Sequence, residues 1–73
     1  MTIKRKIKFI HEGNHVAEVS VDVIEDETSW SPYISVADAM RLDDVRAALS
    51  KGDLRKAATI GKVYRLQPIA EAP

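Results

Sequence analysis

The sequence contains no cysteine, which excludes disulfide bonds and zinc sites built on thiolates. This chain of 73 residues therefore cannot be stabilised by either kind of cross-link. A domain of this size buries only about 60% of the surface that its unfolded chain exposes, and we expect a net stability of about 3–5 kcal/mol. Dimerisation is the remaining common way to stabilise a small core, so a homodimer stays an open alternative.

Long apolar runs are also missing. No segment approaches the length of a membrane span, and no apolar run of the required length follows the basic N-terminus as it would in a secretory signal. We therefore expect a cytoplasmic protein with no membrane segment. Net charge is missing as well, because eleven basic and eleven acidic residues cancel. The chain lacks the broad positive field of many nucleic-acid-binding proteins, although a local basic patch would still serve.

Residues that build most active sites are sparse. The three glycines are scattered over turn positions, so they form no glycine-rich phosphate loop. The only histidines, His11 and His15, flank one turn, and with Glu12 or Glu18 they would supply only a weak surface metal site. The neighbouring carboxylates of Asp43–Asp44 do not converge, since adjacent positions of a helix point in different directions. We predict that the chain is not an enzyme and binds no metal or cofactor.

Hydrophobicity and charge alternate in the first part of the chain. Residues 3–10 and 15–24 both alternate with a period of two, which is typical of half-buried strands. The residues between them, His11–Asn14, are a turn signal. The first strand is basic and the second is acidic, so cross-strand charge pairs would stabilise their pairing. This region therefore predicts an antiparallel β-hairpin.

The hydrophobic pattern also predicts the register of this hairpin. A three-residue loop, Glu12–Asn14, places Ile7 opposite Val19, so that apolar side chains share one face. A two-residue loop would instead place Phe9 opposite Glu18, and a slip of one residue flips a whole face. We therefore predict the three-residue loop. Combined with the apolar phases of the later elements, it predicts a core that includes Ile7, Phe9, Val19, Val21, Leu49 and Leu54.

The second half of the chain contains residues that are typical of helix caps. Ser35, Asp43 and Asp53 are residues of the N-cap type, and each precedes a short apolar periodicity. Gly52 and Gly61 are typical of helix ends. Residues 62–67 alternate again and predict a final strand, which the proline at position 68 ends.

These elements predict an α+β fold. It consists of an N-terminal antiparallel β-hairpin, two or three short helices and a C-terminal strand that joins the sheet. Residues 1–67 are expected to form a single small domain, and residues 68–73 a frayed C-terminal tail.

Three segments, Tyr33–Ala39, Lys51–Leu54 and Ile60–Leu66, resemble excisionase and MerR-type winged helix-turn-helix domains. In those families Ser/Thr-Val-x-x-Ala opens the first helix, Gly-x-Leu ends the recognition helix, and Ile-Gly precedes a basic, aromatic wing strand. The match covers about half the chain and departs from the family at residues 42–44, where the turn before the recognition helix is shortened. The resemblance implies DNA binding, with these residues facing phosphates from the recognition helix and the wing: Arg46, Lys51, Lys62, Tyr64 and Arg65.

A different surface is suggested by three consecutive acids, Glu25, Asp26 and Glu27, which precede the only tryptophan, Trp30. Pro32 disfavours a helical residue before it, so residues 30–34 are expected to be an edge strand or an extended crossing over the core. Acidic loops steer basic partners, and exposed aromatic rings anchor them. In size and style the chain resembles small bacterial antitoxins. We predict a non-catalytic protein-interaction module that binds a basic protein through Glu25, Asp26, Glu27, Trp30 and Tyr33, with DNA binding as the alternative.

Overall fold

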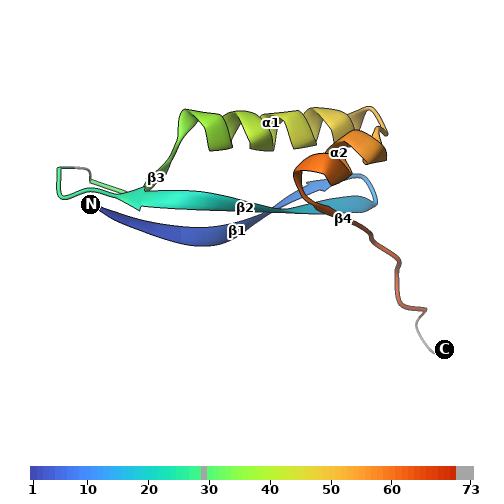
Figure 1. Cartoon of the computed structure of the whole chain (residues 1–73). Coiled ribbons are helices and arrows are strands. Elements are labelled where there is room, and N and C mark those ends of the chain that lie inside the picture. The colour runs from blue at the N-terminus through green and yellow to red at the C-terminus, as the bar shows by residue number, and fades with distance from the viewer. Residues whose placement is uncertain (29, 71–73) are drawn as a thin grey trace.

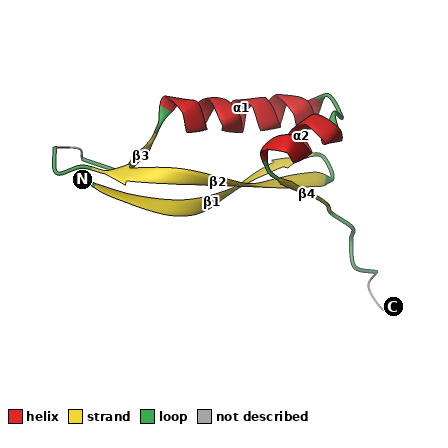
Figure 2. Cartoon of the chain, in the orientation of Figure 1, coloured by secondary structure: helices red, strands yellow, loops and turns green. Residues whose placement is uncertain are grey.

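A computed structural model describes residues 1–28 and 30–70 of the chain. Its elements follow in the order β1 (Thr2–Glu12), β2 (His15–Glu25), β3 (Tyr33–Ile34), α1 (Val36–Ser50), α2 (Leu54–Ile60) and β4 (Lys62–Arg65). The predicted α+β class is confirmed, because an N-terminal hairpin and two helices are followed by a C-terminal strand that is bonded to the sheet (Figure 2).

Both helices lie on one side of the sheet, so the molecule has two layers (Figure 1). β2 is the central strand: β1 pairs with one of its edges, and β4 and β3 pair with the two ends of the other edge, all antiparallel. We call the side toward the helices the covered face; it carries Ala17, Val19 and Val21 of β2. The opposite side, the open face, carries Ile7 and Phe9 of β1.

The predicted register of the hairpin is wrong. Glu12 pairs with His15, so the turn contains only Gly13 and Asn14, and Phe9 lies opposite Glu18. Gly13 has a φ of +60°, whereas Asn14 has no positive φ. A left-handed glycine at the first central position is the pattern of a type II′ turn, whose twist matches that of the flanking strands. The turn chemistry therefore determines the register in place of the apolar pattern.

This register changes the core. Val19, Val21 and Leu49 are buried as predicted, and Leu54 is half-buried against them. The expectation for Ile7 and Phe9 is wrong, because these side chains lie on the open face and keep 52% and 65% of their surface exposed.

Ile10 is the residue that β1 contributes to the core. Three lysines of β1 point to the same side as Ile10 but stay exposed, because β1 is an edge strand. They are Lys4, Lys6 and Lys8, which lie opposite Val23, Val21 and Val19. Toward its N-terminus β1 lies farther from α1 than β2 does (Figure 1). Lysine ammonium groups therefore reach water there while their stems lie along the sheet.

A single helix replaces the two that were predicted over residues 35–51. Ser35 caps α1 as expected, since its side chain accepts a hydrogen bond from the backbone N–H of Asp38. The predicted second N-cap, Asp43, instead lies inside α1, where its carboxylate is 3.6 Å from the guanidinium of Arg46. Exposed positions of one helix accommodate such an acid readily, and the pair with Arg46 has the favourable spacing of three residues.

The connection from α1 to α2 follows the predicted caps. Gly52 has a φ of +76°, and its N–H donates to the carbonyl of Leu49, while Asp53 donates its N–H to Ala48. This is the Schellman arrangement, which favours glycine at the left-handed position. The carboxylate of Asp53 then accepts from the N–H of Lys56 and caps α2. Because this turn is short, α2 begins close to the end of α1 and packs against it.

On the edge of β2 opposite β1, side chains of α1 take the place of a strand between β4 and β3. β4 pairs with residues 15–18 and β3 with residues 23–24, so no described strand lies beside residues 19–22 on that side. Asp38 and Arg41 of α1 occupy this interval and hydrogen-bond to backbone groups of Asp22 and Ser20. The helix therefore continues the hydrogen bonding that a strand would supply.

The end of β4 lies beside the hairpin turn. β4 is shorter than the predicted residues 62–67, and Leu66 donates its N–H to the carbonyl of Asn14 at 2.7 Å. Residues 66–70 continue without helix or strand, and the remainder of the predicted tail, residues 71–73, lies outside the described residues. Neither α1 nor α2, the helices of the described part, has the length and apolar character that crossing a membrane requires.

Candidate protein-interaction site

The acidic residues of the predicted site lie where β2 ends. Glu25 is the last residue of β2, and its carboxylate lies 3.7 Å from the ammonium group of Lys4. Asp26 is half-buried, and its Oδ1 accepts a hydrogen bond from the N–H of Thr28 at 3.1 Å. This Asx-type turn reverses the chain after the strand. Glu27 is exposed.

Trp30 is the most exposed part of this site. Its side chain reaches 104% of its reference exposure, so the indole ring makes almost no contact with the rest of the protein. Trp30 and Ser31 lie in a bend of the chain that precedes β3. Glu25, Asp26 and Trp30, together with Ser31 and Pro32, line an open cavity of about 310 Å³. Such a volume lies at the lower end of the range for ligand sites.

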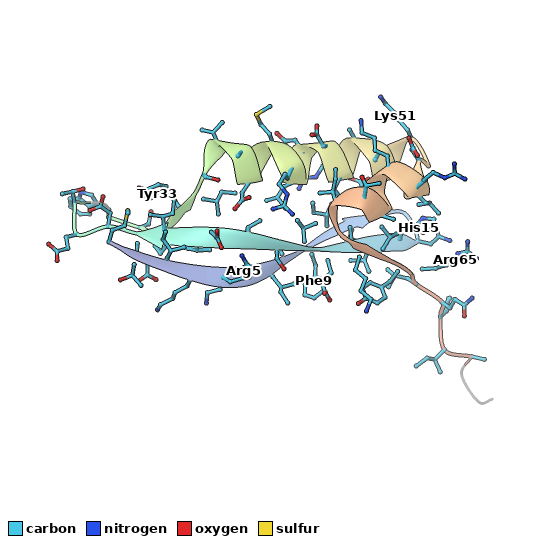
Figure 3. All side chains as sticks on the ribbon, viewed as in Figure 1. Arg5, Phe9, His15, Tyr33, Lys51 and Arg65 are labelled. Atoms are coloured by element: carbon cyan, nitrogen blue, oxygen red, sulfur yellow. The ribbon has the colours of Figure 1, made fainter. Side chains whose placement is uncertain are left out.

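Tyr33 lies beside this cavity rather than in it. It pairs with Ile24 in the sheet, and paired residues share a face, so Tyr33 belongs to the open face. In Figure 3 its label marks the same end of the molecule, next to the loop that joins β2 to β3. The structure therefore brings Glu25, Asp26 and Trp30 together and places Tyr33 on an adjoining surface.

The electrostatics of the loop are those of a negative surface. Glu25 has Lys4 as an ion-pair partner, but both groups remain substantially exposed. Asp26 and Glu27 form no ion pair within residues 1–28 and 30–70. Two of the three carboxylates are therefore available to a positively charged group from outside.

Residues expected from the winged-helix resemblance do not form one surface. Arg46 is on α1 and Lys51 caps its C-terminal end, both in the helix layer. Lys62 and Tyr64 pair with Glu18 and Val16, which places them on the open face, where the Lys62 ammonium group lies 5.5 Å from the Tyr64 ring centre. The fifth residue, Arg65, pairs with His15 on the covered side of the sheet. The set is distributed over both layers of the molecule.

The two histidines beside the hairpin turn point to opposite faces. His11 pairs with Val16 on the open side, and its Nε2 lies 2.7 Å from the carbonyl oxygen of Gly13. His15 pairs with Glu12 on the covered side, and its Nε2 is buried without a hydrogen-bond partner among the described residues. Nowhere in the described part of the chain do three histidine or acidic side chains gather as metal ligands.

A second exposed surface does not follow from the alternation of apolar and polar residues alone. Ile3, Ile7 and Phe9 stand on the open face, all more than half exposed. The signal that identifies this surface is the Gly13-Asn14 pair, because a two-residue turn moves these three side chains away from the helices.

Comparisons of the chain with models of protein families, with curated proteins and with solved structures find no match.

Proposed function

We propose that the chain is a non-catalytic protein-interaction module that binds a basic partner protein through the loop between β2 and β3. The observation that carries this proposal is the complete exposure of Trp30 beside two carboxylates. Tryptophan is highly buried on average, and it is enriched at the energetic centres of protein interfaces. An indole ring that is fully exposed is suited to enter a pocket of another protein.

The charge of the loop selects the chemistry of the partner. A lysine or arginine from the partner would meet Glu25, Asp26 and Trp30 in the same open cavity. Attraction to the carboxylates would raise the rate of encounter. A cation placed over the indole face would add a cation–π interaction of about 0.5–2 kcal/mol. The acids would thus act mainly on association and the ring mainly on dissociation.

The test is to capture partners from a lysate of the native host with the tagged full chain, and then to measure association and dissociation rates. Asp26→Asn combined with Glu27→Gln removes two charges and keeps an oxygen that accepts from Thr28. This variant should slow association at low salt and lose its effect when the Debye length falls below about 8 Å. Trp30→Ala should speed dissociation about tenfold or more, as truncation of an interface centre does.

Matched controls lie on the exposed side of α1. Asp43→Asn combined with Asp44→Asn removes the same charge, and Met40→Ala removes an apolar side chain that is 60% exposed. Neither control should change either rate. Capture of no protein, or of a partner whose binding is the same with the loop variants as with the α1 controls, contradicts the proposal.

A further inference from the structure

A feature independent of Trp30 is the free edge of β1. β1 pairs with β2 over its whole length and with no other strand of the described residues. The hydrogen bonds of β2 show which backbone groups of β1 are left over. Asp22 donates its N–H to α1, and the carbonyl of Ser20 accepts from α1, so both residues direct these groups away from β1.

In an antiparallel pair, directly opposed residues direct their backbone groups either both inward or both outward. Arg5 lies opposite Asp22 and Ile7 lies opposite Ser20, so both direct their N–H and C=O groups toward the free edge. The alternation extends along the strand to Ile3, Phe9 and His11. Five residues therefore present a continuous ladder of unpaired donors and acceptors, which is the template for addition of another strand.

The two sides of this edge differ in chemistry. On the open face, Ile3, Ile7 and Phe9 are more than half exposed. On the covered side, Lys6 and Lys8 are exposed and form no ion pair within residues 1–28 and 30–70. A strand that pairs here would meet a mainly apolar row on the open side, interrupted by Arg5, whose guanidinium lies 3.5 Å from Asp22. On the covered side it would meet ammonium groups.

A second copy of the chain does not fit this edge well. Antiparallel pairing of two β1 strands places even-numbered residues opposite even-numbered residues, since the odd ones carry the free backbone groups. The registers in which the two strands overlap most are centred on Lys6, Ile7 or Lys8. Centring the pair on Ile7 brings Lys6 opposite the partner's Lys8, and centring it on Lys6 or Lys8 brings a lysine opposite its own copy. Registers displaced toward the turn avoid these pairs but align fewer residues. Like charges directly opposite each other are destabilising. The lysines therefore protect the exposed edge from self-association.

We propose that β1 accepts an extended segment of a partner protein by strand addition, and that this segment alternates acidic and apolar residues. Its acids lie opposite Lys6 and Lys8, and its apolar residues lie opposite Ile7 and Phe9. Main-chain hydrogen bonds to the odd-numbered residues supply the affinity, and the two rows of side chains supply the selectivity. The same lysines that repel a second copy select this partner.

The experiment uses the full chain and a short capped peptide in which Glu alternates with Val. Amide hydrogen exchange, followed by NMR, should slow at Arg5, Ile7 and Phe9 by about tenfold when the free peptide is at ten times its Kd. The amides of Lys6 and Lys8, which are already bonded to β2, should change little. The matched probe, in which Lys alternates with Val, should produce no protection.

Variants of the chain test the charge rule from the other side. Lys6→Glu combined with Lys8→Glu should weaken binding of the Glu peptide about tenfold or more, because two cross-strand ion pairs become like-charge pairs. Lys51→Glu combined with Lys56→Glu changes the net charge equally in the helix layer and should leave the affinity unchanged. Trp30→Ala should also leave it unchanged, which separates this surface from the loop.

Several results would overturn the inference. They are no slowing of exchange at Arg5, Ile7 and Phe9, equal binding of the Lys and Glu peptides, or slowing confined to residues outside β1. Sedimentation that shows a dimer, together with slow amide exchange at Arg5, Ile7 and Phe9 in the absence of peptide, would also overturn it, because the occupant would then be a second copy. The comparison of the two peptides needs only the natural chain, so the test stands even if the Glu variants fail to fold.

Discussion

The carboxylate of Asp38 on α1 accepts a hydrogen bond from the backbone N–H of Asp22 on β2, with 2.9 Å between Oδ2 and N. Its other oxygen accepts from Nη1 of Arg41 at 3.0 Å, and the same nitrogen donates to the carbonyl of Ser20 at 3.0 Å. Asp38 also donates its own N–H to the cap residue Ser35. The start of α1 is thereby fixed to residues 19–22 of β2, on the edge opposite β1, where no described strand pairs with them.

This arrangement predicts an acid-sensitive fold. The hydrogen bond from the Asp22 backbone, and then that from Arg41, lower the pKa of Asp38 below the ordinary value of an aspartate. A lowered pKa in the folded state means that the stabilisation is complete above the unfolded pKa, near 4, and is lost as the pH falls through the folded pKa. Thermal melts from neutral pH downward should therefore show Tm falling below about pH 4, and Asp38→Asn should flatten that fall while lowering Tm at neutral pH.

Asp44→Asn provides the control, because Asp44 is exposed on the same helix and has no ion-pair partner within the described residues. This variant should leave unchanged both the Tm at neutral pH and the acid limb, which is the fall of Tm at low pH. An acid limb that is equally steep in Asp38→Asn and in the natural chain would assign the pH dependence to other groups.

A pair of truncations tests the observed core. Leu49→Ala should cost about 2–5 kcal/mol, since only 5% of the side chain is exposed, and this loss is comparable to the whole stability expected of so small a domain. Phe9→Ala should cost less than about 1 kcal/mol, because the ring is mostly exposed on the open face. Urea denaturation distinguishes the two. A larger loss of unfolding free energy for Phe9→Ala than for Leu49→Ala would contradict the observed register and support the one that the apolar pattern predicts.

Gly61 is required for close packing rather than for an unusual backbone. A Cβ at this position would lie 2.6 Å from the carbonyl oxygen of Glu18 and 2.8 Å from a methyl carbon of Val19. Its φ of −144° is accessible to any residue. Gly61→Ala should therefore cost about 1–3 kcal/mol through overpacking, and Gly61→Ser should cost at least as much. At Gly52, where φ is +76° in open space, Asn should be tolerated better than Ala.

Much of this fold follows from local chemistry in the sequence. The caps at Ser35 and Asp53 and the glycine ends at positions 52 and 61 all mark real helix boundaries. Asp43 is the exception: it has the residue type of an N-cap but lies in the interior of α1. An aspartate signals a helix start only where the preceding backbone leaves the helix, and residues 36–50 contain no glycine or proline to cause that.

The hairpin register shows where pattern analysis is insufficient. The alternation identifies both strands. The register predicted from it depends on the assumption that the more apolar side of each strand enters the core. In β1 the side that carries three lysines lies toward the helices, because the Gly13-Asn14 turn requires it and Ile10 alone reaches the core. Long lysine stems at an edge tolerate this position. The free edge and the exposed apolar row could not be predicted without the turn type.

The candidate loop was predictable only in part. Its acids and aromatic residues stand out in the sequence, and the structure places Glu25, Asp26 and Trp30 around one cavity. The ion pair between Glu25 and Lys4 depends on the register, which puts Thr2 opposite Glu25. The position of Tyr33 on the open face depends on which residues of β3 pair with β2, and two residues are too few to show a period.

The most direct test of the central claim observes Trp30 itself. Because Trp30 is the only tryptophan of the chain, labelling with 5-fluorotryptophan introduces a single fluorine NMR signal that no partner shares. In the free protein this signal should show the full solvent-isotope shift of an exposed ring. On addition of the captured basic partner, it should move and lose that shift as the ring is buried. A partner that binds while the signal keeps both its position and its solvent-isotope shift would contradict the claim that Trp30 anchors the interaction.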